Sequence, residues 1–487
     1  MLGHEYYNYL YEYMGASGYN FGIDGATELA QVLNKNGDPY SYSNAYNNEG
    51  YFFRGMYSYD NKYFGSLSFR RDASSRFHKD YRWGNFWSAG AAWIISKENF
   101  FDVDWVDELK LKASIGSQGN DNIGNFLYAD NYTIVNNNNS VAYQWLQKGT
   151  KDITWETNSN FNAGLEFDIF KSRVTGSVEF FSRKTTDMLC FVYVPLSGGY
   201  GGSYDNVGNM LNNGVELDLN LNLIRKKDFS WNVSLNATHY KNKITMLNED
   251  NKGFVLDGHA GYVNGNYFHG EGLPLHTLYM KKYAGVNEKG QSQWYMKDSE
   301  TGELTTTYSY GTDFNCGDAD PDLYGGLGTT ITFKGFDFSV NLNYSIGGKA
   351  ADYGYAALMR NPNVQNTGNS FHKDLLKAWS ETNTDSDIPR FQFAIQDVDD
   401  SASSMSDRFI TDASTLTLQN INLGYTLPEK LVKKIGMSKI RVYAAGENLY
   451  YWSKRKGFDP RGSFWGTTST STYAPVRMIT GGITLQF

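Results

Sequence analysis

The feature that most constrains this chain is a strict alternation of apolar and polar residues within strand-length segments. In the segment 336–346 every even position carries a large apolar side chain, and every odd position carries a small polar one. The same alternation returns in the segments 161–169, 215–223 and 231–237. A strand places every second side chain on one face, whereas a helix scatters such a set around its surface. The pattern therefore predicts an all-β fold built of many strands.

Three further features favour a membrane barrel over a soluble β-protein. Charged residues such as Glu216 and Asp218 lie mid-strand on the polar face, short connections alternate with long ones, and aromatic residues such as Tyr57 and Tyr59 crowd the strand ends. A wet lumen, short periplasmic turns, long outer loops and aromatic girdles are typical of bacterial outer-membrane barrels. We find no run of about 18 apolar residues, the length of a spanning helix. We therefore expect an antiparallel transmembrane β-barrel in one unit over 1–487.

The composition agrees with this expectation and allows the strands to be placed. Aromatic residues make up 16% of the chain, and 50 glycines accompany only 9 prolines, which suits pleated strands and tight turns. We expect long outer loops near 15–43, 119–153, 188–204, 246–274, 298–320, 349–406 and 453–472. About 16 strands, of the kind that forms such barrels, are expected near 3–14, 44–59, 62–73, 83–97, 108–118, 154–169, 172–187, 205–224, 228–245, 275–287, 291–297, 321–333, 336–348, 410–427, 438–452 and 474–487.

One strand changes phase along its length. Leu416 and Leu418 share one parity, whereas Ile421 and Leu423 share the other. One extra residue in a strand exchanges its two faces. The sequence therefore predicts a β-bulge near 419–420, or else a strand whose outer part leaves the bilayer.

The last residues form a distinct pattern of their own. Phe487 is terminal, and Leu485 and Ile483 precede it at every second position. This arrangement resembles the recognition strand by which outer-membrane proteins reach their assembly machinery. We therefore predict that these three residues form the assembly signal and that Phe487 is the natural end of the protein.

Six ordered groups of residues carry a resemblance to a known family. The chain resembles the SusC/RagA family of TonB-dependent transporters, which are nutrient importers of the bacterial outer membrane. The groups occur in the family's order, so that the set is far more specific than any one of them. They are 70–77 with 82–88, 109–120, 206–208 with 212–217, 320–326, 423–428, and 448–449 with 457–460.

The resemblance implies a function for the whole protein. Such transporters form barrels of about 22 strands around a folded plug, so this chain would lack the first strands, the plug and the segment that engages TonB. No signal peptide precedes residue 15 either. The family imports an oligosaccharide or a peptide together with a SusD-like surface lipoprotein, and the TonB complex supplies the energy. An outer-membrane barrel enzyme and a surface adhesin are the alternative functions.

Candidate site residues are few. Trp145, Trp379, Phe464 and Trp465 lie in long loops, where aromatic rings bind sugars and peptides or simply pack the loop. Residues 372–380 are expected to form a short amphipathic helix. Arg70 shares the lumen-facing parity of its strand, and we expect it to pair with carboxylates of the barrel or the plug.

Other classes of chemistry find little support. The net charge is -8 and the basic residues are dispersed, so a nucleic-acid partner is not expected. The seven histidines form no metal-ligating or catalytic pattern, so we expect no metal, no cofactor and no enzyme. The acidic runs 318–322 and 397–400 are interpreted as solvated turns rather than calcium loops. Cys190 and Cys316 are expected to be separate thiols.

Overall fold

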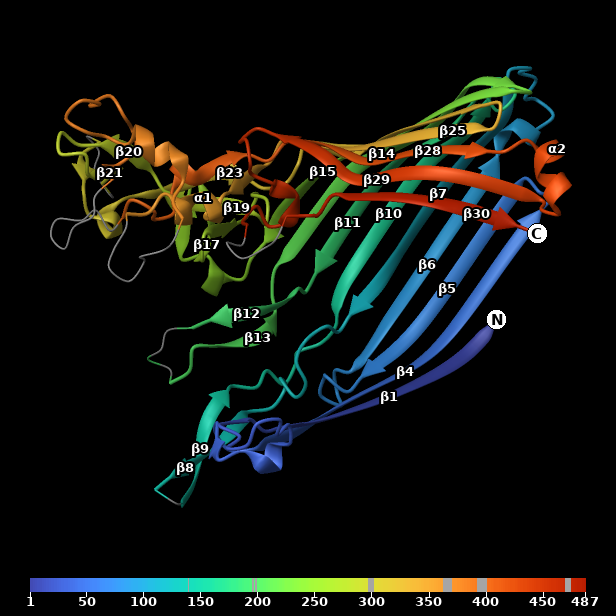
Figure 1. Cartoon of the computed structure of the whole chain (residues 1–487). Helices are drawn as coiled ribbons and strands as arrows, with labels where there is room; N and C mark the ends of the chain where they lie inside the picture. Colours follow the sequence, from blue (N-terminus) through green and yellow to red (C-terminus); the bar gives the residue numbers. More distant parts are fainter. Residues whose placement is uncertain are drawn as a thin grey trace.

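The chain forms a curved wall of strands with a body of loops and small sheets at one end (Figure 1). The computed structural model describes residues 1–138, 140–194, 197, 199–296, 302–361, 370–391, 401–468 and 474–487. Within these residues the wall is a single 14-stranded antiparallel sheet in which neighbours in space follow the order of the chain. The antiparallel barrel wall predicted from the alternation is therefore confirmed.

The strands of the wall alternate in direction from β1 to β30. Each pairs with the strand before it and the strand after it, and β1 and β30 are the two edges. They are β1 (Leu2–Gly15), β4 (Tyr40–Tyr59), β5 (Tyr63–Ser74), β6 (Trp83–Ile94), β7 (Val106–Asn120), β10 (Glu156–Ile169), β11 (Val174–Thr186), β14 (Asn209–Lys226), β15 (Phe229–Met246), β24 (Leu323–Phe333), β25 (Phe336–Ile346), β28 (Thr415–Thr426), β29 (Lys439–Ser453) and β30 (Met478–Gln486).

The predicted number of wall strands was wrong by two. The segments 275–287 and 291–297 form β19 (Thr277–Lys281), β20 (Tyr283–Val286) and β21 (Ser292–Tyr295), which belong to small sheets outside the wall. A membrane-crossing strand needs about 9–11 residues, and each of these is half that length. The residues between β15 and β24 are consequently one long outer connection instead of two loops flanking a hairpin.

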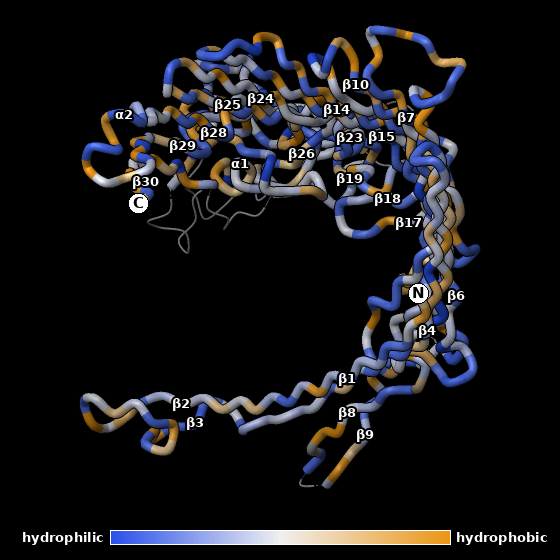
Figure 2. The backbone as a smooth tube through the Cα atoms, turned by 90° about the vertical axis from the view of Figure 1, so that its right-hand side faces the viewer, coloured by the Kyte–Doolittle hydropathy of each residue, from blue (hydrophilic) through white to orange (hydrophobic). Residues whose placement is uncertain are grey.

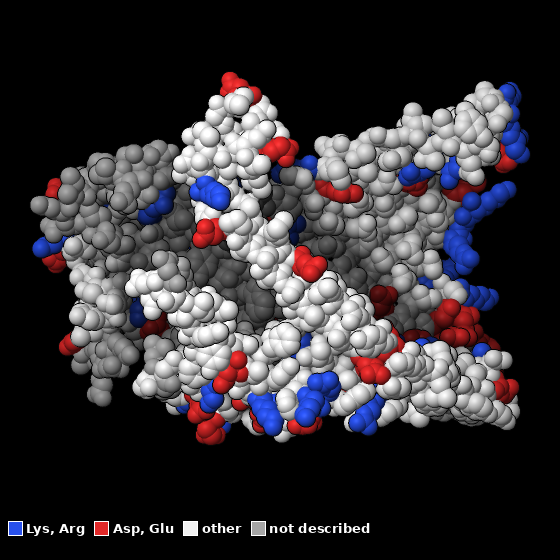
Figure 3. Space-filling model, turned by 90° about the horizontal axis from the view of Figure 1, so that it is seen from below, with Lys and Arg blue, Asp and Glu red and all other residues white. Residues whose placement is uncertain are grey.

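The two ends of the wall differ in their connections. Turns such as 60–62, 227–228 and 334–335 join strands at the end that also carries α2 (Glu429–Val432), while the long connections gather at the other end (Figure 1). On the face seen in Figure 3, charged side chains gather at the short-turn end and also along the lower edge of the view. This asymmetry is typical of outer-membrane barrels, in which short turns face the periplasm.

The alternation of the sequence becomes two chemically different faces of the wall. Phe336, Tyr425, Val442 and Ile483 are register partners in one row across β25, β28, β29 and β30. Phe336 and Val442 are 49% and 45% exposed in the isolated chain, so this apolar face requires lipid to cover it. The opposite face carries the polar residues and lines the concave side. Among the described residues no helix is both long and apolar enough to cross a membrane.

The predicted bulge is confirmed. Asn341 pairs with Asn420 and Leu342 pairs with Leu418, so Gln419 is the extra residue in β28. Because of it, Leu418 and Ile421 both lie on the apolar face although they differ in parity.

The two edges of the wall lie far apart, and the sheet curves as an open arch in Figure 2. The well-buried clusters lie outside the lipid-facing wall, among the outer connections and the strand ends. One cluster contains Phe77, Phe86 and Trp155, a second contains Met359 and Phe409, and a third contains Leu278 and Met280. The outer loops are therefore packed structures with their own cores.

On the polar face an ion pair bridges three strands. Arg441 of β29 donates to Asp337 of β25 through Nη2 at 2.6 Å and through Nε at 3.0 Å. The pair passes over Gly424 of β28, where a Cβ would collide with the guanidinium and lie 2.6 Å from both carboxylate oxygens. Glycine is thus required at this position for the close approach.

We predict that Gly424→Val in the full-length protein lowers the stability of the folded barrel more than Asp337→Asn does. Asp337→Asn removes a partly exposed ion pair, worth about 1 kcal/mol. Gly424→Val also adds overpacking, which costs about 1–3 kcal/mol. Heat-dependent migration of the barrel on denaturing gels measures the effect. Equal midpoints for Gly424→Val and the wild type would contradict the proposed crossing.

Candidate substrate cavity and its outer boundary

A cavity of about 920 Å³ lies on the polar face of the wall at its outer end. Strands β11, β14, β15, β24, β25 and β28 supply its floor, and residues 460–464 close part of its outer side. We call it the luminal cavity. Its size falls in the range of small-molecule sites. Polar and aromatic side chains dominate its lining, including Arg183, Asn212, Tyr240, Asn343, Gln419 and Phe464.

A second cavity of about 790 Å³, the rim cavity, lies further out beside α1 (Tyr353–Leu358) and the end of β29. Asp352, Tyr355 and Arg455 are among its lining residues. Residues 457–464 contribute to the linings of both cavities. We call residues 457–468 the dividing segment, because it separates the luminal cavity from the rim cavity.

The dividing segment is fixed to the wall by a charged residue. Arg461 donates to Asp459 at 2.8 Å and 2.7 Å, donates to Thr417 of β28 at 3.2 Å, and lies 4.8 Å from the ring centre of Tyr451. A guanidinium that makes two parallel bonds to one carboxylate is held in a single orientation. Phe458, which is buried, completes the anchorage on this side.

On its other side the dividing segment is held by the outer-loop sheets. The Tyr267 hydroxyl donates to the Trp465 carbonyl at 2.7 Å, and the Ala351 amide donates to the Gly466 carbonyl at 2.6 Å. The Phe464 and Trp465 rings both meet His276 edge to face, with centroid distances of 5.3 Å and 4.9 Å. The segment is therefore clamped between the wall and the outer body.

Asp320 of the acidic run 318–322 forms part of this clamp, so this part of the run is not the solvated turn expected from the sequence, whereas Asp322 is exposed. Asp320 lies 3.2 Å from His276, and its side chain is only 10% exposed. The Tyr240 hydroxyl donates to the same carboxylate at 3.4 Å. Burial raises the pKa of Asp318, and the neighbouring Asp320 raises it further. The run was misread because its burial depends on long-range packing. The run 397–400 lies outside the described residues.

The rim cavity contains a compact polar cluster. The Tyr355 hydroxyl donates to Asp374 at 3.0 Å, its ring meets His372 edge to face at 4.7 Å, and the Arg455 guanidinium lies 4.4 Å from its ring centre. Burial, together with the bond to Asp374, raises the pKa of Tyr355 to about 12. Arg455 also pairs with Asp352 at 3.3 Å. Tyr355 is therefore a neutral hydrogen-bond donor at physiological pH.

The structure brings two of the four candidate aromatic residues together and leaves the other two apart. Phe464, 70% exposed, lines the luminal cavity beside Trp465. Trp145 lies in the hairpin of β8 (Asn131–Asn137) and β9 (Ser140–Gln147), where it packs against Tyr200 at 5.3 Å. Trp379 is half-buried in the connection between β25 and β28, with its ring close over Gly290. In the structure both of these rings contact other loop residues.

Sequence reasoning missed several residues of the luminal cavity. Arg183, Asn212 and Tyr240 lie on the polar parity of strands that had been placed correctly. The feature of the sequence that could have identified them is their position on the polar face near the outer ends of those strands. Arg70, in contrast, was read correctly, since it donates to Glu5 at 3.0 Å and to Asp72 at 2.7 Å.

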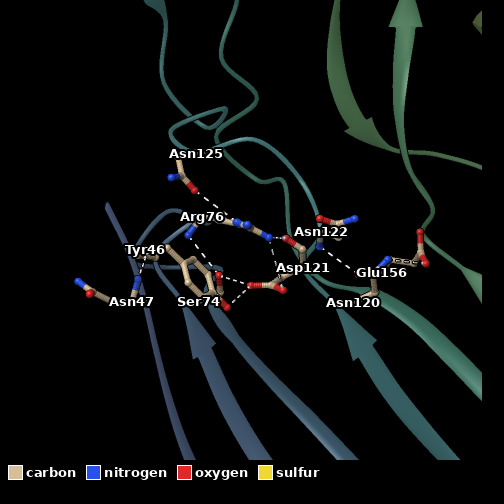
Figure 4. A network of polar contacts seen from close by, with 10 residues as sticks. Tyr46, Asn47, Ser74, Arg76, Asn120, Asp121, Asn122, Asn125 and Glu156 are labelled. Carbon is tan, nitrogen blue, oxygen red and sulfur yellow. Dashed lines mark hydrogen bonds and ion pairs between the residues drawn. The ribbon is translucent and has the colours of Figure 1, made fainter. Parts of the chain in front are cut away.

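We call the six groups of residues that carry the family resemblance the signature residues. Ser74 and Arg76 of the first group meet Asp121, which directly follows the second group, at the outer ends of the strands (Figure 4). The hydroxyl groups of Tyr46 and Ser74 donate to Asp121 at 2.8 Å and 2.6 Å, and Arg76 donates to the Asp121 carbonyl at 2.8 Å. The Arg76 guanidinium also lies 4.6 Å from the ring centre of Tyr46. These residues fix the start of the loop that follows β7, which is a scaffold role.

A third signature residue supports the same junction. Asn206 accepts a bond from the Thr154 amide at 2.7 Å and donates to the carbonyls of Thr154 and Asp187, each at 2.9 Å. Beneath it, Phe77 is fully buried between Phe86 and Trp155. The signature therefore marks where the outer loops are attached to the wall.

Other expectations concern metals, thiols and the short helix. In the part of the chain that the structure describes, no three His, Cys, Asp or Glu side chains gather closely enough to hold a metal ion. Cys190 and Cys316 are both free, and burial raises their pKa to about 11 and about 12. Residues 373–377 form one short 3-10 helix that buries Leu375.

Comparison with known proteins agrees with this geometry. Residues 2–315 match the family model described as TonB dependent receptor-like, beta-barrel. The chain is 30% identical over 430 residues to TonB-dependent receptor SusC of Bacteroides thetaiotaomicron, covering 84% of this chain and 41% of that protein. It is 28% identical over 477 residues to TonB-dependent receptor P3 of Formosa agariphila, covering 92% and 46%.

A solved structure described as the RagAB peptide transporter superimposes with a TM-score of 0.84 at 29% identity, covering 100% of this chain and 53% of that chain. The chain thus spans about half the length of the relatives it matches.

The lipid-facing wall, the short and long connections and the polar luminal cavity define a bacterial outer-membrane β-barrel. The chain belongs to the TonB-dependent receptor-like β-barrel family, and within it to the SusC/RagA type.

We predict that Phe77→Ala loosens the junction between the wall and the loop that follows β7. Truncating a fully buried phenylalanine costs about 3–5 kcal/mol of stability. Here it would destabilise the buried cluster that contains Phe86 and Trp155. Limited proteolysis of intact cells that carry the full-length protein measures the effect as faster cleavage within 121–155. Phe126→Ala is the matched control, because Phe126 is 51% exposed in the same loop. Equal cleavage rates for the two variants would contradict the assigned role.

Proposed function

We propose that the full-length protein imports a bulky nutrient, an oligosaccharide or a peptide, across the outer membrane. In this proposal a plug fills the barrel, the TonB complex supplies energy from the inner membrane, and a SusD-like surface lipoprotein covers the outer loops. The chain described here supplies the wall, the luminal cavity and the outer loops.

The luminal cavity is the observation that carries the proposal. It opens on the polar face of a lipid-facing wall, at the end where the long connections gather, and the dividing segment bounds it on the outside. A solute captured there is already inside the barrel, so the remaining step is passage toward the periplasm. The solved relative is described as a peptide transporter, and the sequence relatives are named as receptors. Both facts support transport over the alternatives of a barrel enzyme or an adhesin.

The aromatic residues of the dividing segment supply a candidate contact with the substrate. Phe464 offers an exposed ring in the luminal cavity, with amide side chains on the floor beneath it. Such a combination binds apolar faces of sugars or peptide side chains while satisfying their polar groups. Trp465 then acts mainly by holding the ring of Phe464 in place through His276.

Deletion and complementation of the full-length gene in its native host test the proposal. We expect the deletion strain to lose uptake of a labelled oligosaccharide pool or a labelled peptide pool, and the wild-type gene to restore it. A protonophore should abolish that uptake, because TonB-dependent import requires the inner-membrane gradient. A surface lipoprotein should copurify from detergent-solubilised membranes.

Variants of this chain refine the test. Phe464→Ala should weaken uptake about tenfold, since stacking and burial of one aromatic ring are worth about 1–3 kcal/mol. Phe254→Ala is the control, because Phe254 is 54% exposed in an outer loop that does not line the luminal cavity. Unchanged uptake in the deletion strain, or uptake indifferent to the protonophore, would contradict active import. Hydrolysis of the same probes by the purified protein would favour the enzyme alternative.

A further inference from the structure

Arg183 is the unusual residue of the luminal cavity. It lies near the end of β11, exposed on the polar face, with its guanidinium 5.1 Å from the ring centre of Phe181. Its register partners on the two neighbouring strands are Asn160 of β10 and Asn212 of β14. The cation therefore has an aromatic ring on its own strand and neutral amides on each side.

The other arginines that line the two cavities have carboxylate partners. Arg461 is held by Asp459, and Arg455 by Asp352. Within the described ranges no Asp or Glu oxygen lies within 4.0 Å of Arg183. A guanidinium is always charged at physiological pH and offers five donors. In this cavity it is consequently a charge available to a ligand.

The nearest carboxylates along the strands do not neutralise Arg183. Glu179 lies four residues earlier on β11, about 13 Å along an extended strand, and is paired with Lys112 at 2.8 Å. Glu216, which also lines the luminal cavity, is the register partner of Glu179 on β14 and lies four residues along that strand from Asn212. Glu179 and Glu216 therefore lie nearer the periplasm than the cation, while Asp320, the other carboxylate in the cavity lining, is held by His276.

A neighbouring amide is oriented so that it adds a second donor. The Leu275 amide donates to Asn242 Oδ1 at 2.8 Å, which fixes that side chain, and Asn242 Nδ2 then donates to Asn212 Oδ1 at 2.7 Å. With its oxygen occupied, Asn212 has its NH₂ group left to donate. No acceptor among the described residues is bonded to that nitrogen. Arg183 and Asn212 thus present donors side by side on one row of the wall.

We propose that Arg183, assisted by Asn212, binds a carboxylate of the imported substrate in the luminal cavity. The inference rests on the proposed function and narrows the substrate to one that carries a carboxylate. The planar fork of a guanidinium matches a carboxylate with two parallel bonds, which lysine cannot reproduce. Phe464, in the lining of the same cavity, contacts an uncharged part of the same molecule.

Two pairs of probes test the inference in cells that carry the full-length transporter with its native neighbours. One pair is an oligosaccharide that ends in a uronic acid and the neutral oligosaccharide of equal length. The other is a peptide with a free carboxyl terminus and the same peptide amidated. The two pairs distinguish an acidic sugar from a peptide as the source of the carboxylate.

We expect Arg183→Gln to reduce uptake of the carboxylate-bearing member of one pair about ten- to hundredfold, the loss typical of one charge-assisted contact, and to leave its neutral counterpart nearly unchanged. Arg183→Lys should restore part of the difference, because it keeps the charge and loses the fork. Arg54→Gln is the matched control, since Arg54 is an exposed arginine whose register partner is Ser68 on the polar face, away from both cavities.

Three outcomes would overturn the inference. An equal loss for both members of a pair would mean that Arg183 only supports the wall or the plug. Uptake of both members unaffected by Arg183→Gln would mean that it binds nothing, while import itself would stand. Wild-type uptake of neither pair would contradict the proposed function together with the inference.

Discussion

The structure depends on the requirement that backbone groups inside a bilayer find hydrogen-bond partners within the protein. A strand meets this requirement only by pairing along both edges, so a wall of consecutive antiparallel strands follows directly. In the described residues each strand from β4 to β29 in the wall has a neighbour on both sides. The pleat then gives every strand two faces. Apolar residues on one face contact lipid, and polar residues on the other face line the lumen.

The polar face must solve a second problem, because charges that face a confined lumen need partners. Lys110 and Lys112 share Glu166, and Arg441 reaches across β28 to Asp337. At the outer end the same principle holds the dividing segment, where Arg461 binds Asp459 and contacts Thr417. Arg183, in the lining of the luminal cavity, has no carboxylate partner among the described residues, and neither has Arg54, which lies away from that cavity. Because no carboxylate in the described part of the chain holds Arg183, its guanidinium is available to bind a ligand in the luminal cavity.

Much of the wall could be predicted because its causes are local. The parity of Phe336 to Ile346 fixes the faces of β25, and the change of parity after Leu418 locates the bulge at Gln419. The short strands β19 to β21 were misplaced because alternation indicates a strand with one buried face, but it does not indicate whether lipid or other protein segments cover that face. The cavity was largely invisible for the same reason. Nothing near Arg183 in the sequence reveals that Asn160 and Asn212 flank it, or that Asp320 is buried against His276.

The assignment of the two faces is tested most directly by labelling single cysteines along β25. The full-length protein with Cys190→Ser and Cys316→Ser would carry cysteine in turn at positions 338, 339, 340 and 341, in native outer membranes. A membrane-impermeant maleimide reagent small enough to enter the barrel should label positions 339 and 341, which face the lumen. Positions 338 and 340, which face lipid, should stay unlabelled until detergent is added. Equal labelling at all four positions, or the reverse alternation, would contradict the account of the wall.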